Sequence, residues 1–147
     1  MVGLGYEELN ESMCIDEFKM LAVTYVEGLE GLYGDGVVGL APSAQRSDAS
    51  VFIDELYRER IIQKKIFSME LNSLASGLSS SISLGSYSLP LIYSEENIAW
   101  NDIENPYFWS VRLVEASIGN RTIGLSTSTA LIDSGTAYVI APEEDFS

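Results

Sequence analysis

The chain has 147 residues, and its 8 lysine and arginine residues against 22 aspartate and glutamate residues give a formal net charge of −14 without any histidine. The length and the 46% hydrophobic content are typical of a globular chain, and the negative charge argues against nucleic acid or an anionic membrane as a partner. Without histidine the chain cannot form a Ser–His–Asp triad, a Cys–His dyad or a His-ligated zinc site, and the single cysteine, Cys14, excludes an internal disulfide and a Cys₄ metal site. Carboxylate chemistry, lysine chemistry or no chemistry remains.

Most of the elements that the sequence predicts are strands. Eight segments have the apolar and β-branched composition or the two-residue alternation of strands. They are residues 18–26, 66–71, 81–84, 87–93, 107–117, 121–125, 129–132 and 137–140. Gly119-Asn120 predicts a hairpin turn before residues 121–125, and a turn over residues 133–136 joins the last two strands into a hairpin.

One segment has a helical pattern. Residues 50–62 carry an apolar stripe near 3.6 residues per turn, with Asp48 or Ser50 available as a cap and basic residues gathered late. The serine-rich segment 73–83 predicts a loop or short linker, with a domain boundary a little after it.

Two short motifs suggest function, and the first fails a physical check. Residues 34–39, Gly-Asp-Gly-Val-Val-Gly, match the G-x-G-x-x-G pattern of dinucleotide-binding sites. That motif needs a helix to follow, whose N-terminus faces the pyrophosphate, and Pro42 would interrupt such a helix. Asp35 would also repel phosphate. The segment therefore predicts a buried strand between glycines.

The second motif is Asp133-Ser134-Gly135-Thr136, which follows the apolar residues 130–132. A carboxylate on this tight turn needs hydrogen bonds, and the Gly135 and Thr136 backbone N–H groups and the Thr136 hydroxyl are placed to supply them. The tetrapeptide alone is also what an ordinary Asp-Ser-Gly hairpin turn contains.

The two motifs and the segments between them resemble pepsin-like aspartic proteases. Residues 35–41 are similar to the family's D-G-I-L-G-L-A segment, and the helix running into residues 66–71 is similar to its helix and F-S-x-x-L strand. Residues 82–85, Trp100 and residues 106–111 resemble the next strands, and residues 130–136 resemble the second active-site loop, with its D-[ST]-G-[ST] pattern. The resemblance covers the chain in order from about Ala22 onward.

The resemblance implies a mainly β, incomplete pepsin-like bilobal fold with one amphipathic helix. Residues 1–88 would be the second half of the N-terminal lobe with central-sheet strands, and residues 89–147 the first half of the C-terminal lobe. The implied activity is that of an aspartic endopeptidase, which hydrolyses polypeptide substrates with a water activated between two aspartates. It implies neither a metal nor an organic cofactor. We expect neither a nucleic acid nor a membrane partner.

The resemblance also implies roles for seven residues. Asp133 would be the catalytic aspartate of the C-terminal lobe, with Ser134 bonding to the opposite loop and Gly135 and Thr136 holding the carboxylate. Val37, Leu131 and Phe108 would contact substrate side chains.

The departure from the family pattern is that D-[ST]-G occurs once, at residues 133–135. We therefore expect a fragment that needs the remainder of a bilobal chain for its second aspartate and is inactive alone. A symmetric dimer could supply a second carboxylate, but such a dimer would lack a flap. The alternative is a non-catalytic, β-rich peptide- or protein-binding pseudo-peptidase. The family resemblance suggests secretion or an acidic organelle such as a vacuole or lysosome. The N-x-S/T sequons at Asn10 and Asn120 are compatible with secretion.

Overall fold

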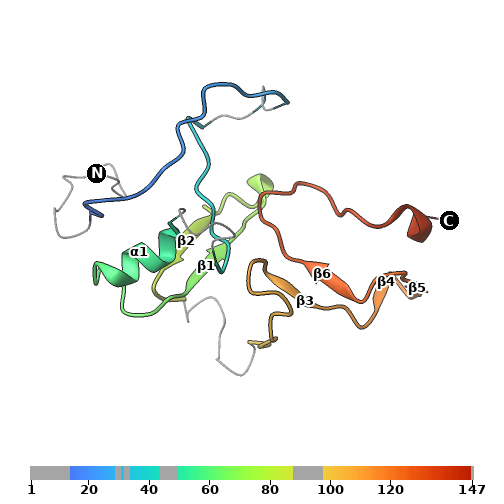
Figure 1. Ribbon diagram of the computed structural model, residues 1–147. Helices are drawn as coiled ribbons and strands as arrows, with labels where there is room; N and C mark the ends of the chain where they lie inside the picture. The colour runs from blue at the N-terminus through green and yellow to red at the C-terminus, as the bar shows by residue number, and fades with distance from the viewer. Residues whose placement is uncertain (1–13, 29–30, 32–33, 44–49, 88–97, 147) are drawn as a thin grey trace. The chain divides into compact units, whose positions relative to one another are not determined.

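The computed structural model describes residues 14–28, 31, 34–43, 50–87 and 98–146 (Figure 1). The chain divides into two compact units, one formed by residues 1–40 and 44–98 and the other by residues 41–43 and 99–147. The regular elements of the first unit are α1 (Phe52–Arg58), β1 (Phe67–Glu70), the 3₁₀ helix η2 (Leu74–Ser76) and β2 (Ser81–Leu84). Those of the second are β3 (Ser110–Arg112), β4 (Ala116–Ile118), β5 (Arg121–Ile123), β6 (Thr129–Leu131) and the 3₁₀ helix η4 (Glu143–Phe146). The prediction of a mainly β chain with one amphipathic helix is confirmed within the described residues.

The first unit holds the buried core, which forms around the apolar face of α1. Its members are the side chains of Ile15, Phe52, Ile53, Leu56 and Ile62. The Phe18 ring meets the Phe52 ring edge to face, with 5.8 Å between centroids. Each large apolar side chain buried in this way contributes about 1.5–3 kcal/mol relative to exposure. Among the described helices, none is both long enough and apolar enough to cross a bilayer.

Helix α1 is shorter than the predicted helix at residues 50–62. Its N-cap is Val51, which has extended backbone angles and makes no side-chain capping bond, so Ser50 is not the cap; Asp48 lies outside the described residues. At the other end the Arg60 N–H donates to the Tyr57 carbonyl (3.1 Å), and the Ile61 N–H donates to the Leu56 carbonyl (2.9 Å). These two bonds form a Schellman motif, which ends the helix at Arg58.

Strands β1 and β2 form an antiparallel hairpin in which Phe67 pairs with Leu84 and Glu70 with Ser81. The serine-rich segment is therefore the loop of this hairpin up to Ser80 and not a linker between strand groups, and its residues 81–83 belong to β2. Asn72 holds the loop, because its backbone N–H donates to the Ser80 hydroxyl and its side-chain amide donates to the Ser79 carbonyl, each at 2.9 Å. Phe67 and Leu84 both pack against the core.

The second unit contains two separate antiparallel pairs, β3 with β6 and β4 with β5. Ser110 pairs with Leu131 in the first, and Ile118 pairs with Arg121 across the predicted Gly119-Asn120 turn in the second. The predicted hairpin of residues 129–132 with 137–140 is wrong, because β6 pairs with β3 instead.

The other strand predictions have mixed outcomes. Residues 18–26 are not a strand, and their side chains from Lys19 onward are exposed. Of the predicted strand 87–93, all but Tyr87 lies outside the described residues. The alternation predicted for residues 66–71 holds for Phe67, which is partly buried, but Met69 and Leu71 on the same face are exposed. The segment is thus a strand with only one end at the core.

Candidate active site

The backbone that leads to Asp133 is fixed by the β3–β6 ladder. The Ile132 N–H donates to the Trp109 carbonyl at 2.9 Å, which carries the pairing one residue beyond the end of β6. At the other end of the pair, the Leu113 N–H donates to the Ser128 carbonyl at 2.8 Å. Asp133 therefore begins a tight turn directly after a paired strand.

The Asp133 carboxylate is held by its own loop, although it is exposed to solvent. The Gly135 N–H donates to Oδ1 at 2.9 Å, and the Thr136 hydroxyl donates to Oδ2 at 2.6 Å. The Thr136 N–H does not reach the carboxylate and donates instead to the Asp133 backbone carbonyl at 3.3 Å. Both carboxylate oxygens thus have one donor each from the motif.

These bonds favour the ionised form of the group. The Thr136 hydroxyl, and after it the Gly135 N–H, lower the pKa of Asp133 below its ordinary value of 3.8. A side chain at position 135 would crowd the same group, because a Cβ there would lie 3.2 Å from Oδ1. Glycine at this position therefore leaves room for the carboxylate to face its donors.

Two acidic side chains support the backbone around β6, and neither was predicted from the sequence. The Thr129 hydroxyl donates to Glu104 Oε2 at 2.7 Å, and the Glu104 N–H donates to the Ser110 carbonyl at 2.9 Å. The Ser126 N–H donates to Asp145 Oδ1 at 2.7 Å. These partners lie 25 and 19 residues apart in the chain, so no local pattern marks them.

The other predicted site residues are in different places. Ser134 is exposed in the turn beside Asp133. Leu131, at the end of β6, is 63% exposed, and Phe108, two residues before β3, is 42% exposed. Val37 belongs to the first unit and is 78% exposed, so the buried strand predicted for residues 34–39 is wrong. Leu131 and the four motif residues thus lie within six residues of the chain, and Phe108 directly precedes Trp109, whose carbonyl accepts the Ile132 N–H.

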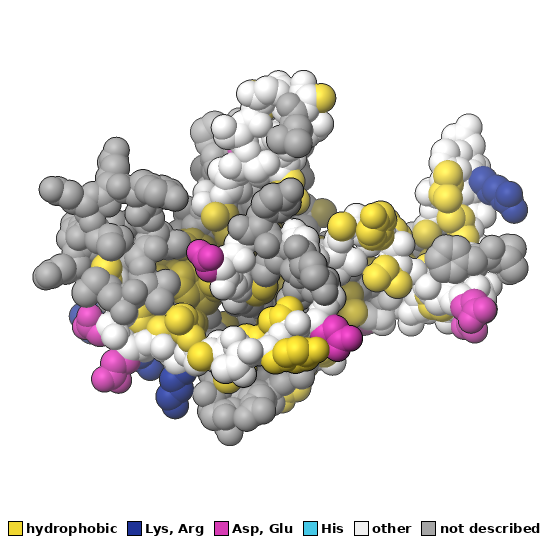
Figure 2. All heavy atoms as spheres, turned by 90° about the horizontal axis from the view of Figure 1, so that it is seen from above, with side chains coloured by type: hydrophobic (Ala, Val, Ile, Leu, Met, Phe, Trp, Pro, Cys, Tyr) yellow, Lys and Arg dark blue, Asp and Glu magenta, His cyan; other side chains and the backbone are white. Residues whose placement is uncertain are grey.

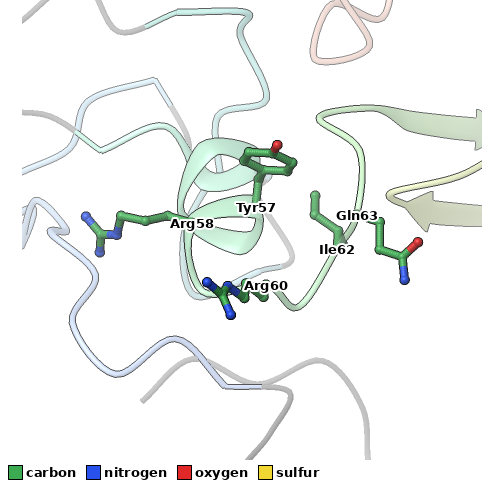
Figure 3. A pocket seen from close by; sticks show the side chains of 5 residues that line it. All are labelled: Tyr57, Arg58, Arg60, Ile62 and Gln63. Carbon is green, nitrogen blue, oxygen red and sulfur yellow. The ribbon is translucent and has the colours of Figure 1, made fainter.

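A pocket of the first unit lies at the end of α1, lined by Tyr57, Arg58, Arg60, Ile62 and Gln63 (Figure 3). Figure 3 shows the Arg58 and Gln63 side chains pointing away from each other. Arg58 already pairs with Glu55 and, at 3.2 Å, with Glu59. The polar ends of this pocket do not converge on one point, so we assign no chemistry to it. The described residues contain no group of three Cys, Asp or Glu side chains that could hold a metal ion.

The comparisons with known proteins that find a match all find aspartic proteases. A family model described as eukaryotic aspartyl protease matches residues 8–147. Pepsin II-2/3 of Oryctolagus cuniculus is 26% identical over 157 residues, which cover 98% of this chain and 38% of that protein. Pepsin A of Rhinolophus ferrumequinum is 25% identical, with 95% of this chain and 36% of that protein covered.

Cathepsin D of Gallus gallus is also similar, at 25% identity over 98% of this chain and 35% of that protein. The chain spans little more than a third of the length of these curated relatives. No solved structure matches it.

Proposed function

The chain belongs to the eukaryotic aspartyl protease family, and on this basis we propose that it is part of a pepsin-like endopeptidase in which Asp133 is one of the two catalytic carboxylates. The observation that carries the proposal is the hydrogen bonding of the Asp133 carboxylate by Gly135 and Thr136 within a D-S-G-T turn. An ordinary hairpin turn would explain a bond to one backbone N–H. Here a hydroxyl also holds the second oxygen, and the turn follows a strand that is paired on one side.

The chemistry requires a second carboxylate close to Asp133. Two such groups share one proton, because like charges in contact do not both ionise easily. The ionised carboxylate accepts a proton from a bound water as the water attacks the scissile carbonyl carbon, and the protonated carboxyl donates to the carbonyl oxygen. The donors from Gly135 and Thr136 suit Asp133 to carry the negative charge of the pair.

The remaining motif residue and the apolar residues around it have supporting roles in this proposal. Ser134 forms a hydrogen bond to the loop that carries the second aspartate. Leu131, Val37 and Phe108 contact substrate side chains on either side of the cut, and their exposure leaves them available for contact.

The second aspartate comes from the remainder of a longer bilobal polypeptide. In this proposal residues 1–88 belong to its N-terminal lobe and residues 89–147 to its C-terminal lobe. The substrate is a polypeptide. The protein acts outside the cell or in an acidic organelle, where the low pH keeps one proton on the carboxylate pair.

An activity measurement on two lengths of polypeptide tests the proposal. The 147-residue chain alone is expected not to cleave denatured protein at acid pH, because D-[ST]-G occurs in it once. The longer polypeptide that also supplies the second aspartate is expected to cleave, with inhibition by a pepstatin-type inhibitor and loss of cleavage in Asp133→Asn. Inhibitable cleavage by the 147-residue chain alone, or an Asp133→Asn enzyme with full activity, would refute the assignment.

The alternative is a non-catalytic peptide- or protein-binding member of the family. The occurrence of a single D-[ST]-G favours it. Peptide binding that survives in Asp133→Asn, together with no cleavage by the longer polypeptide, would support this alternative over the endopeptidase.

A further inference from the structure

The hairpin of β4 and β5 (Figure 1) ends in a tight two-residue turn, Gly119-Asn120. Gly119 has φ +59°, and Arg60 is the only non-glycine residue with positive φ among the described residues, so φ of Asn120 is negative. Positive then negative φ, with glycine first, is the sign pattern of a type II′ turn. The turn therefore places Asn120 at the apex of the hairpin.

The apex is open on all sides that the structure describes. Residues 117–122 are all exposed, and a Cβ added to Gly119 would meet no atom within 4 Å. No described residue hydrogen-bonds to the Asn120 side-chain amide or to the Thr122 hydroxyl. The amide nitrogen of Asn120 is thus free to react, and space around it is sufficient for a bulky group.

Asn120, Arg121 and Thr122 form an N-x-S/T sequon, in which Thr122 lies on β5 opposite Ser117. We propose that Asn120 is an N-glycosylation site. This proposal rests on the secretory or lysosomal location given under the proposed function. The sequon alone occurs often by chance. Its placement at an exposed apex, with both the amide and the hydroxyl unengaged, is what distinguishes this one.

The reaction is a transfer from a polyprenyl diphosphate-linked oligosaccharide. The Asn120 side-chain nitrogen forms a bond to the anomeric carbon of the sugar, and the bond between that carbon and the diphosphate oxygen breaks. The electron pair of the broken bond leaves with the lipid diphosphate, and the amide nitrogen loses one proton to a base of the transferase. No oxidant or reductant is needed.

A glycan at this position would also cover an exposed edge. The β4–β5 pair has only two strands, so each strand keeps one unpaired edge within the described residues, and Ile118 beside the turn is exposed. Unpaired edges with apolar side chains promote association between chains. A bulky, hydrated group at the apex hinders such pairing without changing the charge of the chain.

The test is cell-free translation of the full chain in the presence of endoplasmic reticulum microsomes. The chain carries an added cleavable signal peptide and an added C-terminal reporter sequon, and only molecules with a modified reporter are counted, because these have reached the lumen. The location is thereby supplied by the experiment, so a failure at Asn120 is separate from a failure of the proposed function. The variants are Asn120→Gln, Thr122→Ala and Thr122→Ser, with Asn10→Gln as control for the other sequon.

We expect a glycosidase-sensitive mobility shift beyond that of the reporter in the unmodified chain, in Thr122→Ser and in Asn10→Gln. When Asn120→Gln and Thr122→Ala are made in the Asn10→Gln chain, the shift should be lost. Reporter-modified Asn10→Gln molecules without a further shift, or a shift that persists when Asn120→Gln is added to them, would overturn the proposal. If the microsomes add the glycan but the protein isolated from its own cells lacks it, the proposed secretory or lysosomal location is wrong, whereas Asn120 is still a competent glycosylation site.

Discussion

Arg60 is expected to be a site of stored backbone strain, and replacing it with glycine should stabilise the first unit. It occupies the C′ position of the Schellman motif after α1 with φ +59°, where glycine is the usual residue. The left-handed conformation costs a residue with a Cβ about 1–2 kcal/mol. Arg60→Gly removes this cost from the folded state.

The gain is reduced because glycine has more freedom in the unfolded chain. That entropy term is about 0.4–1 kcal/mol, so the net gain in the free energy of unfolding is about 0.5–1 kcal/mol. Loss of the guanidinium group could alter stability as well, in a chain with a net charge of −14. Arg60→Ala is the matched control, because it removes the same charge and keeps the Cβ.

Native-state hydrogen exchange at the Ile61 amide measures the effect, since this N–H donates to the Leu56 carbonyl across the motif. Exchange in Arg60→Gly should be about two to five times slower than in the unmodified chain, and Arg60→Ala should not show this gain. If exchange slows equally in Arg60→Gly and Arg60→Ala relative to the unmodified chain, the guanidinium group, and not the backbone angle, determines stability there. The strain argument would then be wrong.

Two further predictions concern the motif turn and the glycines. Thr136→Val removes the donor to Asp133 Oδ2 and should raise the pKa of Asp133 toward 3.8, which NMR titration of the carboxyl carbon measures. Thr136→Ser keeps a hydroxyl and should not raise this pKa. An unchanged pKa in Thr136→Val would contradict the role of the hydroxyl. The pKa of Asp133 is lower in the folded state than in the unfolded state, so its carboxylate stabilises the fold fully at a pH above the unfolded-state pKa. This stabilisation is lost as the pH falls through the folded-state pKa. Asp133→Asn should remove this pH dependence of stability. Gly85→Ala should destabilise the first unit by about 2–4 kcal/mol, because φ is +76° and the new Cβ would lie 2.7 Å from Ile62 Cβ. Gly77→Ala, with φ +69° and no atom within 4 Å, should cost only about 1–2 kcal/mol in the same urea titration, and equal losses would rule out the steric contribution.

Local features of the sequence were predicted best. The Gly119-Asn120 turn, the strand that follows it and the existence of a helix within residues 50–62 follow from patterns within a dozen residues. The single strand predicted for residues 107–117 is wrong, because the structure has β3 and β4 there, with different partners. The donors to Asp133 were also within reach, because Gly135 and Thr136 are its near neighbours in the chain.

Pairing between distant segments was not predictable in this way. Residues 137–140 are as apolar as a strand, but β6 pairs with β3, about twenty residues earlier in the chain, and a local pattern does not indicate which distant strand will be the partner. The end of α1 was missed for a related reason. An arginine does not predict a left-handed backbone conformation, whereas a glycine at position 60 would have predicted the end of the helix.

The segment that follows the motif turn is the most exposed apolar stretch described, with Tyr138, Val139 and Ile140 at 84%, 97% and 80% exposure. Within the described part of the chain it joins no sheet, and hydrophobic side chains are visible on the surface in Figure 2. The orientation of Asp133 within its loop is set by Gly135 and Thr136, whereas among the described residues the loop itself is anchored to a ladder on its upstream side alone. A polypeptide that aligned with residues 137–140 would therefore anchor the downstream side as well. Binding of that polypeptide and rigid placement of the Asp133 carboxylate would then be a single event.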